Sequence, residues 1–214
     1  MSDGGSEQPA TTTGSDTGTD ADADVETADA DDSGDPGDDA RYDPIGEIAS
    51  IYEPYRVTGD NGDVLLTPLA DDEREAFRAY VDNLPTRPAD EIGPAYDYQR
   101  AKYGDTEIRA SPDELLPHAT WADGANFERG MLGDAKYVAD GEQSFFIPST
   151  MSPYMELIAQ QKMDDRLAKY GAVIDDPDSP VRGLEITTNH PAAADFIADR
   201  MDGLNIAGVV LLED

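Results

Sequence analysis

The sequence predicts an α+β fold that begins after a disordered, acidic N-terminal tail. Two observations predict this arrangement. The first 40 residues carry 13 acidic side chains, no basic one and almost no large apolar residue. After them, apolar residues recur with helical spacing in some stretches and with strand spacing in others.

A segment as acidic as residues 1–40 cannot bury enough apolar surface to offset the entropy lost when its backbone is ordered. We therefore expect it to be disordered. The rest of the chain is long enough for one hydrophobic core, with a smaller additional unit. The predicted regions are a disordered acidic tail at 1–40, an N-terminal α+β portion at 41–134 and a C-terminal α+β unit at 135–214.

The strongest compositional signal is charge. The chain has 47 acidic and 15 basic residues, for a formal net charge of -32. In dilute buffer such a charge opposes a compact state by self-repulsion. At about 1 M salt the Debye length falls to about 3 Å and most of the repulsion is screened. The composition therefore predicts a halophilic protein, adapted to a salt-loaded cytoplasm such as that of haloarchaea.

Composition also excludes or disfavours several classes of protein. The chain has no cysteine, which excludes disulfides, thiolate metal sites and cysteine nucleophiles. No apolar run approaches the roughly 18 residues of a membrane span. The acidic N-terminus lacks the features of a signal peptide, so a location in the cytoplasm or in a virion is predicted. The net charge argues against nucleic acid as a partner, because phosphate contacts supply most of that affinity in ordinary buffer.

The N-terminal portion is predicted to be less regular than the C-terminal unit. Asn61-Gly62 lies between two β-prone runs, which is typical of a tight hairpin. Apolar residues at helical spacing follow this turn, and prolines end the pattern. The expected elements are a hairpin over 55–67, a helix over 71–84, an irregular stretch over 85–110, a short capped helix from 111 and a loop over 118–134.

The C-terminal unit is predicted to be ferredoxin-like. From residue 143 onward the element order is strand, helix, strand, strand, helix, strand, which resembles the split βαβ arrangement of ferredoxin-like folds. The resemblance is one of element order and implies no functional residues. The expected elements are a hairpin around Asp140-Gly141, a helix over 153–170 ended by Gly171, strands at 172–174 and 184–188, a helix over 191–201 capped by Asn189 or His190, and a strand over 206–212.

The last strand has an unusual pattern. Ala207, Val209 and Leu211 are as apolar as the residues between them, so the period-2 alternation of a half-exposed strand is missing. Both faces of this strand are expected to be buried. Either residues 42–134 or another chain would provide the second cover.

No catalytic or metal-binding constellation is predicted from the sequence. His118 and His190 each lack a second histidine at ligand spacing. The acidic loops at 60–63 and 175–178 do not match an EF-hand, and turn chemistry explains their residue types. Gly130 and Gly133 are interpreted as loop residues. No catalytic residue, metal or cofactor is therefore assigned.

The leading prediction is a non-enzymatic interaction or structural protein of a halophilic archaeon or its virus, such as an assembly or virion component. Its partner would be another protein or a second copy of the chain, because tyrosine and tryptophan are enriched at interfaces. Two alternatives remain open: a small-ligand-binding or regulatory module built on a ferredoxin-like dimer, and an enzyme that uses carboxylates with a divalent cation. The interface candidates are Tyr96, Tyr98, Tyr103, Trp121, Ala207, Val209 and Leu211.

Overall fold

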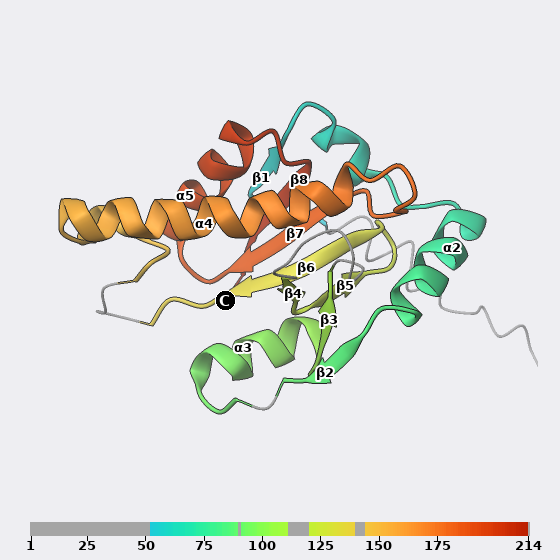
Figure 1. The fold of residues 1–214 in the computed structure, drawn as a ribbon, viewed down its shortest axis with the longest axis horizontal. Coiled ribbons are helices and arrows are strands. Elements are labelled where there is room, and N and C mark those ends of the chain that lie inside the picture. The colour runs from blue at the N-terminus through green and yellow to red at the C-terminus, as the bar shows by residue number, and fades with distance from the viewer. Residues whose placement is uncertain (1–51, 90, 111–119, 140–143, 214) are drawn as a thin grey trace, which may run out of the picture. The chain divides into compact units, whose positions relative to one another are not determined.

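The computed structural model describes residues 52–89, 91–110, 120–139 and 144–213. Within these residues it confirms a mixed α+β fold, with one sheet of five strands and one of three strands (Figure 1). The predicted acidic tail, the short helix from 111 and the Asp140-Gly141 turn lie outside the described residues.

The strands are β1 (Arg56–Thr58), β2 (Thr86–Pro88), β3 (Thr106–Arg109), β4 (Trp121–Ala122), β5 (Gly124–Asn126), β6 (Met131–Lys136), β7 (Gly183–Thr188) and β8 (Gly208–Leu212). The α-helices are α2 (Asp71–Asp82), α3 (Pro94–Tyr103), α4 (Pro153–Ile174) and α5 (Pro191–Gly203). Two 3-10 helices, η1 (Gly62–Leu66) and η2 (Pro148–Thr150), complete the set for these residues.

The five-stranded sheet has the order β1-β8-β7-β6-β5. Its three central strands, β6, β7 and β8, are parallel and are connected through α4 and α5. The edge strands β1 and β5 pair antiparallel with their neighbours. Helices α4 and α5 cover one face of this sheet, and α3 lies on the other side (Figure 1). The three-stranded sheet has the order β2-β3-β4 and is antiparallel.

The main core lies between the five-stranded sheet and α4 and α5. Leu132, Leu184 and Val210 are almost fully buried there and belong to one apolar cluster with side chains of both helices. Alternate residues of a strand point to one face, which explains why these positions share a core. Leu167 and Ile197, from α4 and α5, belong to the same cluster.

The opposite face of β8 has a smaller apolar cluster. Val209 is fully buried and Leu211 is 7% exposed, and both pack with Leu65 and Met131. Residues of this chain, from η1 and β6, therefore provide the second cover that the pattern of the last strand requires.

The ferredoxin-like arrangement is not confirmed. Residues 172–174 continue α4 instead of forming a strand, and the described residues 144–147 form a turn. Gly171 does not end the helix, which continues to Ile174. Ile206 packs on Gly171, since a Cβ atom at this position would lie 2.6 Å from Ile206 Cδ1.

Other local predictions for the N-terminal portion are wrong in instructive ways. Asn61-Gly62 does not join a hairpin: β1 pairs with β8, and η1 replaces the second predicted strand. The stretches interpreted as irregular, 85–110 and 118–134, contain most of β2 to β6 and α3. Most of these strands have only two to four residues, and β6 pairs with β7, which lies about 50 residues further along the chain, so local periodicity is weak.

Two helix predictions are confirmed. Helix α2 follows the predicted amphipathic pattern and buries Phe77 and Val81. Helix α5 begins after His190, whose Nδ1 accepts the backbone N–H of Ala192 at 3.2 Å. This cap gives His190 a local structural role.

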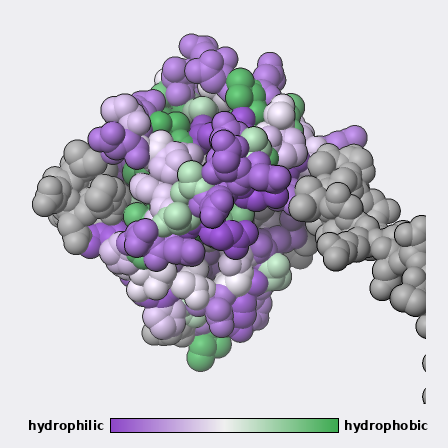
Figure 2. All heavy atoms as spheres, turned by 90° about the vertical axis from the view of Figure 1, so that its right-hand side faces the viewer, coloured by the Kyte–Doolittle hydropathy of each residue, from purple (hydrophilic) through white to green (hydrophobic). Residues whose placement is uncertain are grey.

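The face turned toward the viewer in Figure 2 is mostly hydrophilic, with scattered apolar side chains. Among the described residues, no helix has the length and apolar composition needed to cross a bilayer.

Candidate active site

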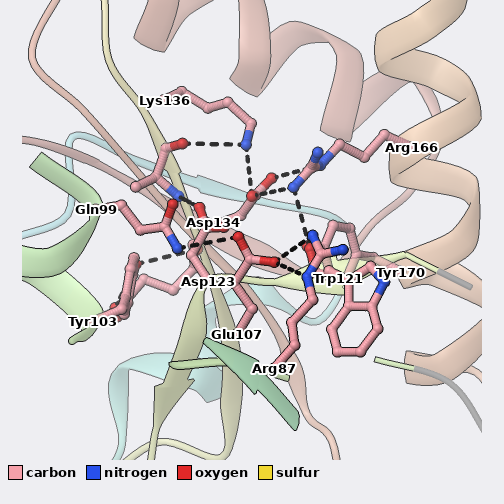
Figure 3. A network of polar contacts seen from close by, with 12 residues as sticks. Arg87, Gln99, Tyr103, Glu107, Trp121, Asp123, Asp134, Lys136, Arg166 and Tyr170 are labelled. Atoms are coloured by element: carbon pink, nitrogen blue, oxygen red, sulfur yellow. Dashed lines mark hydrogen bonds and ion pairs between the residues drawn. The ribbon is translucent and has the colours of Figure 1, made fainter. Parts of the chain in front are cut away.

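The centre of the candidate site is the end of β6. Asp134 and Lys136 are two residues apart on this strand, so their side chains point to the same face of the sheet. Both are buried, with exposed fractions of 1% and 5%. Lys136 Nζ lies 2.5 Å from Asp134 Oδ1, and dashed lines in Figure 3 mark this pair.

Arg166, from the middle of α4, completes the charge balance of Asp134. Its Nε and Nη2 donate to Asp134 Oδ2 and Oδ1 at 3.0 and 2.6 Å, a bidentate geometry (Figure 3). Burial alone would raise the pKa of Asp134, but the charges of Arg166 and Lys136 outweigh burial and lower it. Burial lowers the pKa of Lys136, although Asp134 opposes this effect. Asp134 is therefore an ionised carboxylate held between two cations.

A second buried carboxylate, Asp123, lies beside β6. It occupies the single position between β4 and β5, where the chain passes from the three-stranded to the five-stranded sheet. Its backbone N–H donates to Gly133 O at 2.8 Å, and its Oδ2 accepts the backbone N–H of Ala135 at 2.6 Å. These two bonds fix Asp123 against the strand that carries Asp134.

Burial, followed by the negative charge of Asp134, raises the pKa of Asp123 from about 3.8 to about 7. Burial and Asp134 outweigh the positive charges of Lys136 and Arg166, so Asp123 is only partly ionised at neutral pH. A group that adds positive charge beside it would favour its carboxylate form. The two aspartates thus differ: Asp134 is charge-balanced by the protein, whereas Asp123 is not.

Tyr103 holds the two aspartate-bearing segments from the face opposite α4. Its ring lies against Gly124 and Gly133, which directly follow Asp123 and precede Asp134. A Cβ atom at Gly133 would overlap this ring, and one at Gly124 would lie 2.6 Å from Tyr103 Cβ. The two glycines are therefore required by the close approach of one aromatic ring.

The Tyr103 hydroxyl anchors this contact to the central strand. It donates to Glu185 Oε1 at 3.1 Å, and Tyr52 and Asn126 donate to Glu185 Oε2 at 2.7 and 2.8 Å. Glu185, 5% exposed on β7, thus joins three segments that surround the site. Burial and the charge of Glu185 raise the pKa of Tyr103, so it stays neutral and donating.

The two aspartates and Lys136 lie beside a pocket of about 770 Å³. Asp123, Ala135 and Lys136 line this pocket, and Asp134 is buried next to them. Five of the 15 basic residues of the chain line this pocket, including three of its four lysines. The basic residues are Arg87, Lys136, Lys162, Arg166 and Lys169. Four acidic residues, Glu91, Glu107, Asp123 and Asp165, line it as well. The pocket is therefore close to charge-balanced and locally enriched in basic residues, in a chain with three times as many acidic as basic residues.

The far wall of the pocket comes from the three-stranded sheet. Glu107 on β3 accepts hydrogen bonds from Arg87 and, at 3.4 Å, from Gln99 on α3. The Arg87 guanidinium also lies 4.3 Å from the ring centroid of Trp121. The Trp121 carbonyl accepts hydrogen bonds from Arg166 and from Tyr170, so β4 is tied to α4 across the pocket floor.

Two neighbouring carboxylates and a lysine can serve metal-assisted hydrolysis. Mg²⁺ is commonly held by one or two carboxylates together with water and substrate phosphates. Asp123, with a pKa raised by burial and a neighbouring charge, could serve as an oxygen ligand. Asp134, both of whose oxygens already accept from Arg166 and Lys136, would be the second. No group of three or more His, Asp or Glu residues in the described part of the chain gathers at metal-binding distance, so further ligands would come from water and substrate.

The sequence-predicted interface residues fall into three places. Trp121 lines the pocket, and Tyr103 positions its aspartates from behind. Tyr98 is buried beside Tyr137, with ring centroids 5.8 Å apart, and Tyr96 is half-buried on α3. Val209 and Leu211 lie in the cluster on the other face of β8, next to Ala207. Contact with a protein partner or a second copy at these residues stays a prediction.

Sequence reasoning missed Asp123, Asp134 and Lys136. A usable signal was present: Asp134-Ala135-Lys136 ends the apolar run that begins at Met131, and lysine is rare in this chain. A lysine and an aspartate on the same face of a buried strand call for a partner or a ligand.

A family model described as "Restriction endonuclease fold toxin 2" (Tox-REase-2) matches residues 94–207, which include the aspartates, Lys136 and Arg166. A search of curated proteins and a search of solved structures found no match. The family match overturns the prediction of a non-enzymatic structural or virion protein, because it points to an enzymatic toxin. It favours instead the alternative of an enzyme that uses carboxylates with a divalent cation.

The packing of Tyr103 on Gly133 is testable by a double-mutant cycle. Gly133→Ala forces a methyl group into the Tyr103 ring and is expected to lower the free energy of unfolding by about 1–3 kcal/mol. In a Tyr103→Ala background the space is vacant, so most of this cost should disappear. Denaturant unfolding of the four proteins in high salt measures the coupling.

Gly203→Ala is the matched control, since nothing lies within 4 Å of a Cβ atom at that position. It should change stability by less than about 0.5 kcal/mol. Equal costs of Gly133→Ala with and without the Tyr103 ring would show that the ring does not require this glycine.

The raised pKa of Asp123 predicts a pH dependence of stability. Between about pH 4 and pH 7 the folded state keeps a proton that the unfolded state has released, so the free energy of unfolding falls as pH rises. Asp123→Asn lacks this group, and its stability should fall less over the same interval. Urea unfolding with a chelator present, at several pH values, gives both slopes, and parallel slopes would contradict the pKa assignment.

Proposed function

We propose that this chain, which belongs to the restriction endonuclease fold toxin 2 family, is a toxin that hydrolyses phosphodiester bonds of nucleic acid with the help of a divalent cation. One observation carries the proposal. Asp123, Asp134 and Lys136 lie together beside a pocket that also holds a third of the basic residues of a very acidic chain.

Asp123 and Asp134 are the residues that would hold the cation. When bound, a divalent cation polarises a phosphoryl oxygen and lowers the pKa of a bound water. Both carboxylates are buried, and the pKa of Asp123 is raised because burial and Asp134 outweigh the neighbouring positive charges. A bound cation would therefore add the positive charge that Asp123 lacks. Binding at Asp123 requires loss of its proton, so affinity for the cation should rise with pH through about 7.

Lys136 and Arg166 supply fixed positive charge next to the two aspartates. Lys136 is held by Asp134 and by the Ala135 carbonyl, which accepts from Nζ at 3.2 Å. Hydrolysis of a phosphodiester forms a bond from water oxygen to phosphorus and breaks the bond to the leaving sugar oxygen, while negative charge grows on the phosphate. Preorganised cations in a buried site stabilise that charge more than water does.

The substrate backbone would lie along α4. Lys162, Arg166 and Lys169 follow the spacing i, i+4, i+7, so they share one face of this helix, and all three line the pocket. A row of cations beside the reacting centre suits a polyanion with several phosphates. The earlier expectation against nucleic acid came from the net charge of the whole chain, whereas the pocket concentrates the basic residues locally.

The catalytic proposal predicts the loss of activity in two variants. Asp123→Asn removes a cation ligand, and Lys136→Met keeps the bulk of the side chain but removes its charge. Each should lower Mg²⁺-dependent cleavage of nucleic acid at least about 100-fold, the usual effect of removing one charge-stabilising group. A chelator should abolish the activity of the unmodified protein. Gel-based cleavage of DNA and RNA in molar KCl measures these effects.

Asp97→Asn is the control, because Asp97 is an exposed residue of α3 outside the pocket. This variant should retain full activity. Cleavage that survives the chelator, or that is equal in Asp123→Asn and Asp97→Asn, would refute the proposed function.

A further inference from the structure

An aromatic surface adjoins the proposed active site and has no role in the mechanism above. Tyr137, Phe145 and Phe146 line a second pocket, of about 480 Å³, next to α3. Phe145 and Phe146 also line a third pocket, of about 270 Å³, next to α4. Both smaller pockets share residues with the 770 Å³ pocket. The second pocket shares Tyr137 and Phe146 with it. The third pocket shares Lys136 with it.

The two phenylalanines differ in burial. Phe146 packs against the main core and against the small cluster around Val138. Phe145, its neighbour in sequence, is 40% exposed. Core packing therefore accounts for Phe146 but not for Phe145, whose ring borders the pockets.

Cations of the active site lie over these rings. Lys162 Nζ is 5.0 Å from the centroid of the Phe145 ring, and Lys136 Nζ is 5.8 Å from that of Phe146. A ligand group that enters here meets an aromatic face and a phosphate-binding charge at the same place. On the opposite wall, Arg87 lies over the Trp121 ring in the same way. Phe145 is the aromatic residue on this side that is 40% exposed.

A nucleobase next to a phosphate matches this combination. Every base has a π-face that stacks on aromatic side chains, and proteins that bind single strands combine such platforms with a basic groove. In a duplex the base faces are covered by their neighbours, and a base must leave the stack to reach a pocket. The occupant is therefore an unpaired base.

We infer that the active site acts on single-stranded nucleic acid, with an unstacked base next to the reacting phosphate lying on the aromatic subsite formed by Tyr137, Phe145 and Phe146. The inference rests on the proposed nuclease function and specifies its substrate class. DNA and RNA share the required chemistry, and separate substrates distinguish them.

The test compares cleavage of matched substrates by the full chain with Mg²⁺ in molar KCl. The substrates are one oligonucleotide sequence as single-stranded DNA, as single-stranded RNA, as each corresponding duplex, and as a single strand with one abasic position. A single strand of DNA or RNA should be cleaved at least about tenfold faster than its duplex. Cleavage next to the abasic position should fall by about tenfold, ~1.4 kcal/mol.

Phe145→Ala should lower kcat/KM for the single strand about tenfold and so reduce the ratio of single-strand to duplex cleavage, while Phe145→Trp should retain this ratio. Leu157→Ala, at a 50% exposed position of α4 outside all three pockets, is the matched control and should behave as the unmodified protein. Equal or faster duplex cleavage, or no effect of Phe145→Ala, overturns this inference alone. Absence of any cation-dependent cleavage overturns the proposed function as well.

Discussion

The buried carboxylate of Asp134 is the constraint on which the site depends. An ionised group that is 1% exposed is strongly disfavoured unless cations balance it. Lys136 on the same strand and Arg166 on α4 supply that balance. The same requirement fixes α4 over the end of β6, and Arg166 also bonds the Trp121 carbonyl on β4. One charge-balanced carboxylate thereby connects the two sheets and the longest described helix around one pocket.

The opposite face of the sheet keeps the aspartates in register. The Glu185 carboxylate accepts hydrogen bonds from Tyr52, Tyr103 and Asn126. The Tyr103 side chain packs against the glycines next to Asp123 and Asp134. The two faces are therefore coupled through the backbone of β5 and β6. This arrangement lets Asp123 remain without a cation of its own, because packing and backbone hydrogen bonds hold it in place. A site of this kind is preorganised for a ligand that brings positive charge.

Sequence reasoning predicted what local chemistry determines. The amphipathic pattern of α2, the start of α4 at Pro153 and the His190 cap of α5 each depend on neighbouring residues, and the structure has them. The wrong predictions involve contacts far apart in sequence. Ile206 packs on Gly171, and the Tyr103 ring leaves no space for a side chain at Gly133.

The site was missed for the same reason. Asp123 and Asp134 are brought together by the β5–β6 hairpin, which was interpreted as a glycine-containing loop, and their partner Arg166 comes from α4, more than 30 residues further along the chain. Trp121 and Tyr103 were predicted to be interface residues because of their residue type. Residue type alone does not show where in the fold a side chain lies. The net charge of -32 hid this pocket, because a sum over the chain does not show that five basic residues lie together with four acidic ones in one place.

The central claim is that Asp123 and Asp134 form a divalent-cation site, and calorimetry tests it most directly. Mg²⁺ would be titrated into the full chain at pH 7 in buffers of different ionisation enthalpy, so that proton release is measured together with affinity. The account predicts binding that releases about half a proton, the fraction expected from a pKa of about 7, and neither signal in Asp123→Asn. Absence of binding, or binding without proton release that Asp123→Asn retains, would contradict it.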